Sequence, residues 1–147
     1  MSASSGTLLT QAGRLGSVTH GLTTNGSLIN DDIAAQLSDA HVETFVSIDG
    51  PESINDLMRI DTQGRGTFDR ALTGYRTLVA VGADVGLLFT AQPDALTSFA
   101  DSVIQVLEEY EVRKAGVNSP QPMSRGWGLV RNEGTVMGMT TLSMTLP

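Results

Sequence analysis

The residues best suited to hold a small ligand fall in one short stretch of the chain. Ser47 and Asp49 stand at the end of an apolar run, and Arg59 follows in the next polar segment. A guanidinium can bind a carboxylate through two parallel hydrogen bonds, and a serine hydroxyl can donate or accept one. These residue types therefore suit the binding of a ligand that carries a carboxylate.

A local interpretation explains the same residues without a ligand. Asp49 can cap the turn that follows it through an Asx-type hydrogen bond. Arg59 can form an ion pair with Asp56 or Asp61. Both interpretations stay open for Asp49, whereas strand alternation places Ser47 on the face that would meet a ligand.

Asn25 is the next candidate, because it ends an earlier strand-like segment and has Thr23 two residues before it on the same face. Asn-Gly is also a favoured turn pair, since both residues tolerate positive φ. Asn25 is therefore a ligand contact or a turn residue. Gly64 and Gly66 form a Gly-x-Gly without a preceding strand, which is weak evidence for phosphate binding.

The segment that carries Ser47 and Asp49 reads as a β-strand that stops at Asp-Gly-Pro, a turn signal. Alternation places Val46 and Ile48 on one face of this strand. Phe45 shares the opposite face with Ser47 and Asp49. Ligands of parallel α/β folds and barrels bind at the carboxyl ends of strands, so this end is where we expect a site.

Strand and helix patterns alternate along most of the chain. Strands are predicted over 18–24, 44–49, 85–90 and 115–118. Helices are predicted over 7–15, 31–40, 68–81 and 95–110, with Asn30 or Asp31, Thr67 and Asp94 as caps, and the segment 50–66 is predicted to be a long loop. This order predicts parallel βαβ units with right-handed crossovers. The expected fold class is α/β, with about four parallel strands and flanking helices.

A length of 147 residues fits one domain with a buried core. Its expected parts are a terminus and preceding helix over 1–17, βα repeats over 18–118 and an irregular tail over 119–147. The strand 18–24 would leave one edge of the sheet open. We therefore expect self-association, or a partner chain, at that edge.

Three motifs of the chain, in order, resemble the radical S-adenosylmethionine (radical SAM) enzymes. Ser-Ile-Asp-Gly-Pro at 47–51, with the Ile-Asn-Asp and the Arg that follow it, is similar to the family's fourth-strand signature. Leu-Thr-Thr-Asn-Gly-Ser-Leu at 22–28 is similar to the preceding strand and its turn, and Gly-Arg-Gly-Thr-Phe-Asp at 64–69 to the entry into the next helix. The resemblance covers 18–125 and is strongest for the SPASM-type branch that includes the anaerobic sulfatase-maturating enzymes.

This resemblance implies a partial TIM barrel and a specific chemistry. In such enzymes a 4Fe–4S cluster cleaves S-adenosylmethionine (AdoMet) reductively, and the resulting radical abstracts hydrogen from a peptide or protein substrate. The likeness places Ser47 and Arg59 where the aminocarboxylate and ribose of AdoMet are held, with Asn25 and Asp49 beside them. These four are the predicted cofactor-binding residues. No catalytic or metal-binding residue is predicted.

The chain departs from the family where the cluster should be held. It has no cysteine, whereas the family's cluster is ligated by a Cys-x3-Cys-x2-Cys loop. The Gly-Gly-Glu-Pro segment is also missing, and Asn55-Asp56 replaces the usual His-Asp. The resemblance therefore implies an internal fragment, a truncated or cluster-less relative that is not catalytic alone. The alternatives are a binding module for a peptide or nucleoside, a nonfunctional gene fragment, or one part of a two-chain enzyme.

Composition argues against several other functions. A net charge of −7 opposes nonspecific nucleic-acid binding. No apolar run approaches the roughly 20 residues that span a bilayer, and no signal peptide is visible, so a cytoplasmic location without a membrane partner is expected. His20 and His41 lack further ligands at metal-binding spacing, and no Gly-x-Ser-x-Gly elbow marks a hydrolase.

Overall fold

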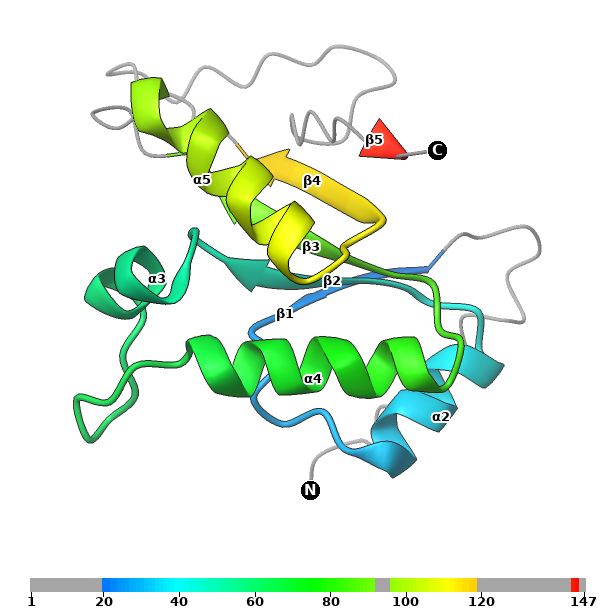
Figure 1. Ribbon diagram of the computed structural model, residues 1–147. Coiled ribbons are helices and arrows are strands. Elements are labelled where there is room, and N and C mark those ends of the chain that lie inside the picture. The colour runs from blue at the N-terminus through cyan, green and yellow to red at the C-terminus, as the bar shows by residue number, and fades with distance from the viewer. Residues whose placement is uncertain (1–19, 92–95, 119–143, 146–147) are drawn as a thin grey trace, which may run out of the picture.

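The computed structural model describes residues 20–91, 96–118 and 144–145. They form a sheet with helices packed on it (Figure 1). The strands are β1 (Gly21–Thr24), β2 (Glu43–Ile48), β3 (Val85–Thr90), β4 (Lys114–Asn118) and β5 (Met144–Thr145). The helices are α2 (Asp31–Asp39), α3 (Glu52–Met58), α4 (Phe68–Ala80) and α5 (Leu96–Glu109). The predicted helix 7–15 and the predicted cap Asp94 lie outside the described residues.

The strands follow one another across the sheet in the order β1-β2-β3-β4-β5. The first four are parallel, which confirms the predicted α/β fold with four parallel strands. Strand β5 pairs antiparallel with β4 through Met144 and Thr145. It falls in the tail over 119–147 that the sequence predicted to be irregular, because two residues are too few for an alternating pattern.

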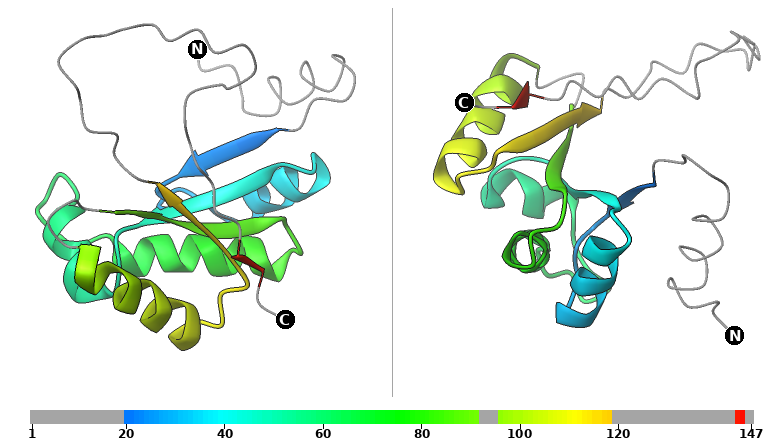
Figure 2. Two further views of the ribbon diagram at one scale, coloured as in Figure 1. Left: turned by 90° about the horizontal axis from the view of Figure 1, so that it is seen from above. Right: turned by 90° about the vertical axis from the view of Figure 1, so that its right-hand side faces the viewer.

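Helices α2, α4 and α5 lie on the same side of the curved sheet (Figure 2). The core between them includes Val46 and Ile48 from β2, as strand alternation predicted. The other buried members of this core come from all the helices except α3, from the strands and from the residues beside them: Ala34, Leu37, Val42, Phe68, Ala71, Leu72, Tyr75, Leu78, Leu87, Phe89, Val106, Leu107, Val112 and Ala115.

On the opposite face of the sheet, the Lys114 side chain lies over Phe45 at the amino end of the strands. Its ammonium lies 5.3 Å from the ring centroid of Phe45 and forms 2.7 Å ion pairs with Glu43 and Asp84. Burial by itself would lower the pKa of Lys114, but the hydrogen bonds and charges of Asp84 and Glu43 outweigh it and raise that pKa. This end of the face is therefore occupied by the protein's own charges.

The prediction of a loop over 50–66 was wrong in part, since this segment contains the helix α3. This helix has seven residues and buries only Asn55, so the sequence has no apolar stripe that would reveal it. The predicted cap of α2 is confirmed, because Asn30 Oδ1 accepts a 2.9 Å hydrogen bond from the Ile33 amide. Thr67 precedes α4 as predicted, but its side chain does not cap that helix.

Strand β1 lies at the edge of the described sheet, and three of its four residues are exposed. Its inner side pairs with β2 through Gly21–Glu43, Leu22–Thr44, Thr23–Phe45 and Thr24–Val46. Within the described ranges, no helix is long and apolar enough to cross a membrane.

Candidate functional site

The carboxyl ends of the parallel strands lie on the side of the sheet where α3 stands (Figure 1). Parallel register brings these ends together, since Ile48 pairs with Phe89 and Thr90 with Asn118. Side chains that follow β2 therefore lie beside the ends of β1 and β3. This is the edge at which the sequence predicted a site.

Two of the predicted site residues contact each other directly at this edge. Arg59 Nε donates to Asp49 Oδ2 at 2.7 Å, and Arg59 Nη2 donates to Asp49 Oδ1 at 2.9 Å. The Asp49 side chain is 7% exposed and that of Arg59 is 28% exposed. The pair is thus a bidentate, partly buried ion pair, a stronger kind of contact than an exposed surface pair.

The local interpretation of Arg59 named the wrong partners. Asp56 accepts hydrogen bonds from Asn55 and from the start of α4, and Asp61 forms ion pairs with Arg65 and Arg70. Helix α3 folds the chain back, so the guanidinium reaches the carboxylate at the end of β2 instead. Sequence separation alone did not reveal this turn of the chain.

The ion pair leaves part of the Arg59 guanidinium available. Arginine has five N–H donors, and Asp49 uses Nε and one donor of Nη2. The Nη1 edge can therefore bind a second carboxylate while Asp49 holds the other edge. A planar fork that is fixed in this way suits a bidentate carboxylate ligand.

Ser47 lies on the same face of β2 as Asp49, one alternation earlier, and is half-buried. Its neighbour in the register is Leu88 of β3. Within the described part of the chain, the Ser47 hydroxyl has no hydrogen-bond partner, so it can donate to or accept from a ligand.

Asn25 is exposed and takes part in a turn. Its Oδ1 accepts hydrogen bonds from the Ser27 amide at 3.0 Å and from the Ser27 hydroxyl at 2.8 Å. This is the Asx-type geometry of the turn interpretation. The side-chain amide nitrogen of Asn25 is the group that stays available for a ligand.

Sequence reasoning missed two polar residues on this edge. Thr90 ends β3 and Asn118 ends β4, and the register pairs them with each other on the face that carries Ser47. Both are half-buried. The signal was present, because each is the last residue of a predicted strand, but neither belongs to a motif.

A second polar cluster holds the loop between α3 and α4. Asp61 accepts hydrogen bonds from the Gln63 and Arg65 amides at 2.8 and 2.9 Å, and it pairs with the guanidinium groups of Arg65 and Arg70. The hydrogen bond from the Arg65 backbone amide is the main cause that lowers the Asp61 pKa to about 2. These contacts are satisfied within the loop, so Asp61 stabilises the loop and has no capacity left for a ligand.

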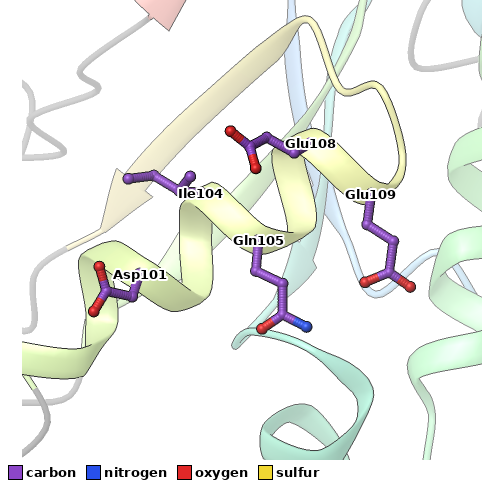
Figure 3. Close-up of a pocket in the computed structure, with 5 residues that line it drawn as sticks. All are labelled: Asp101, Ile104, Gln105, Glu108 and Glu109. Carbon is purple, nitrogen blue, oxygen red and sulfur yellow. The ribbon is translucent and has the colours of Figure 1, made fainter.

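The chain does not provide the ligands of an iron–sulfur cluster. It has no cysteine, and within the described residues no group of three or more His, Cys, Asp or Glu side chains could hold a metal ion. A surface hollow elsewhere comes from α5 alone, whose side chains extend outward along it (Figure 3). They are Asp101, Ile104, Gln105, Glu108 and Glu109, and none is a predicted site residue.

Comparison with known proteins gives matches to anaerobic sulfatase-maturating enzymes. No protein-family model matches the chain. The cysteine-type anaerobic sulfatase-maturating enzyme of Clostridium novyi (strain NT) is 31% identical over 61 residues, which are 42% of this chain and 16% of that enzyme. The similar segment is therefore a small part of the enzyme.

Solved structures of anSMEcpe share the fold. Native anSMEcpe with bound AdoMet has a TM-score of 0.65 and 22% identity, over 77% of this chain and 31% of anSMEcpe. The same protein with AdoMet and the Cp18Cys peptide has a TM-score of 0.65 and 23% identity, over 76% and 31%. At this identity the likeness establishes the fold, a partial radical SAM barrel, as predicted. Together with the sequence match, it confirms the predicted resemblance to radical SAM sulfatase-maturating enzymes.

Proposed function

We propose that this chain is a cluster-less, partial relative of the radical SAM sulfatase-maturating enzymes that binds AdoMet at the carboxyl edge of its sheet. The observation that carries this proposal is the Asp49–Arg59 pair at the end of β2, on a fold shared with a protein solved with bound AdoMet. The guanidinium is fixed, partly exposed and has free donors. It is therefore prepared to receive a carboxylate.

Each predicted residue has a role in this proposal. The Nη1 edge of Arg59 binds the carboxylate of the ligand, and the negative charge of Asp49 favours the neighbouring ammonium group. The Ser47 hydroxyl and the Asn25 side-chain amide bind polar groups of the aminocarboxylate or the ribose. Such charge-assisted contacts give the ligand its orientation as well as its affinity.

Reductive cleavage of AdoMet is not part of the proposed activity of these 147 residues. A 4Fe–4S cluster would supply the electron, and its thiolate ligands are absent from this sequence. In a complete enzyme the cysteines would come from outside the chain described here. Binding without radical chemistry is what these residues can do themselves.

A peptide or protein partner belongs to the same proposal, and its support is the anSMEcpe complex with a peptide. The open edge of β1 is proposed as a second contact surface, for another copy of this chain or for a partner chain. Sedimentation over a range of concentrations tests the self-association, and a monomer at every concentration would contradict it. A cytoplasmic location stays a prediction from the sequence.

Isothermal titration of the chain with AdoMet tests the proposed site. We expect binding in the wild type and an affinity loss of about tenfold or more in Arg59→Ala, because a charge-assisted contact contributes about 1.5–3 kcal/mol. Arg70→Ala is the matched control, since Arg70 lies on α4 and pairs with Asp61 instead of Asp49. Equal affinity in both variants would contradict the role of Arg59.

Titrations with methionine and with adenosine separate the alternatives. The proposed contacts recognise the aminocarboxylate, so methionine should bind weakly and lose its binding in Arg59→Ala. A nucleoside-binding module would instead bind adenosine, with no effect of Arg59→Ala. Absence of AdoMet binding by the folded wild type would overturn the proposed function.

A further inference from the structure

The structure assigns a positioning role to Asn55 and Asp56. They hydrogen-bond to the backbone of the Asp49–Arg59 pair and connect it to the start of α4. The printed side-chain partners of both residues are groups of the protein itself. The consequence for AdoMet rests on the proposed function, but the contacts themselves concern the ligand-free protein. They can therefore be tested without any ligand.

Asn55 is the connection to Asp49. Its side chain is fully buried, and its Oδ1 accepts a 3.1 Å hydrogen bond from the Asp49 amide. This amide lies just after the last residue of β2, so Asn55 satisfies a partly buried donor as the chain leaves the strand. The position of the Asp49 backbone therefore depends on the Asn55 side chain.

Asp56 continues the connection to α4. Its Oδ1 accepts from Asn55 Nδ2 at 3.0 Å and from the Thr67 and Phe68 amides, both at 2.9 Å. These amides open α4, so Asp56 caps the helix from a distant position in the sequence, where Thr67 was expected to cap it. A carboxylate is favoured there because the helix N-terminus carries partial positive charge.

The backbone of Arg59 is held by the same elements. Its amide donates to Asn55 O at 2.8 Å, and its carbonyl accepts from Thr67 Oγ1 at 3.0 Å. Gly66 lies against this cluster, since a Cβ at that position would overlap the Asp56 carboxylate. Both members of the Asp49–Arg59 pair are thus tied to the Asn55–Asp56 dipeptide.

The chemistry explains why position 55 needs both an acceptor and a donor. The acceptor serves the Asp49 amide, and the donor faces the Asp56 carboxylate. Asn55→Asp keeps the shape and the acceptor but places a second carboxylate at the Asp56 oxygen. Two adjacent carboxylates cannot both ionise easily, so this variant should share a proton when the pH falls and regain the donor. Asn55→Leu removes both groups at any pH.

The test measures hydrogen exchange of the Arg59 Nε–H by NMR in the ligand-free protein, with the signal assigned by its loss in Arg59→Lys. We expect Asn55→Leu to speed this exchange at least tenfold while far-UV circular dichroism stays native. At each pH the rate in Asn55→Asp is compared with the wild-type rate at that pH. Near pH 8 the variant should exchange faster than the wild type, and near pH 5.5 the two rates should become similar. Asn30→Asp, a change at the cap of α2, should match the wild type throughout.

An Arg59 Nε–H exchange rate in Asn55→Asp equal to the wild-type rate at pH 8 would overturn the proposal. So would a rate that stays as far above the wild-type rate at pH 5.5 as at pH 8. If Asn55→Leu fails to fold, the two-pH comparison of Asn55→Asp still decides. AdoMet titration of the same variants adds a separate result. Lack of AdoMet binding by the wild type would reject the proposed function and leave the exchange result standing.

Discussion

Gly74 of α4 lies directly against the backbone of Gly26, so that a Cβ on Gly74 would overlap the Gly26 carbonyl oxygen. Gly26 has a φ of +75°, and a Cβ there would lie 2.9 Å from a methyl group of Val46. The two glycines allow the turn after β1 to pass closely between α4 and β2. This contact places Asn25, and with it the end of β1, beside the end of β2.

Gly74→Ala should therefore destabilise the protein, although the same change in an ordinary helix interior stabilises it by about 1 kcal/mol. The added methyl group would push α4 from the Gly26 carbonyl, and such overpacking costs about 1–3 kcal/mol. Urea denaturation measures the change in the free energy of unfolding. Thr73→Ala, at an exposed position of α4, is the control and should change it little. A more stable Gly74→Ala would contradict the close contact.

Gly66→Ala should destabilise the protein for a different reason. Its methyl group would displace the Asp56 carboxylate from the Thr67 and Phe68 amides, at a cost of about 1–3 kcal/mol from overpacking and the loss of a cap. Gly21→Ala in β1 is the matched control, because its nearest neighbour would be 4.0 Å away. Equal midpoints in urea for the two variants would show that the loop adapts to the methyl group.

The sequence predicted those parts of the fold that leave a periodic pattern. The face of β2 formed by Val46 and Ile48 was predicted correctly, because successive side chains of a strand point to opposite faces of the sheet. Helix α5 was also predicted, within 95–110, and its Val106 and Leu107 belong to the core. Helix α3 was missed, since a seven-residue helix that buries an asparagine has no apolar stripe.

The contacts of the site were harder to predict than its residues. Asp49 and Arg59 were chosen from the family resemblance, which their chemistry suits, but their pairing depends on the unpredicted helix between them. The cap of α4 comes from Asp56 and not from Thr67, because a side chain at a distant position reaches the same amides. Local rules assign a cap to the residue that precedes a helix, and they contain no information about a competing side chain.

The pKa of Asp61 predicts a defined dependence of stability on acid. A folded-state pKa of about 2, below the ordinary 3.8, stabilises the folded protein above pH 4, and this contribution is lost as the pH falls toward 2. Asp61→Asn lacks the ionised carboxylate. The difference in unfolding free energy between wild type and Asp61→Asn should therefore shrink from pH 4 to pH 2. A difference that is constant over this range would contradict the lowered pKa.

Lys114→Met should destabilise the protein by about 1 kcal/mol, because it leaves Glu43 and Asp84 near each other without the ammonium between them. The raised pKa of Lys114 means that its contribution is complete below pH 10.5, the ordinary value, and is lost at higher pH. Urea denaturation near neutral pH should show the difference from wild type, and about 1 M salt should reduce it by screening. Lys114→Arg keeps a cation over Phe45 and should fall between the two. A Lys114→Met protein as stable as wild type at low salt would show that this ion cluster contributes nothing to the free energy of unfolding.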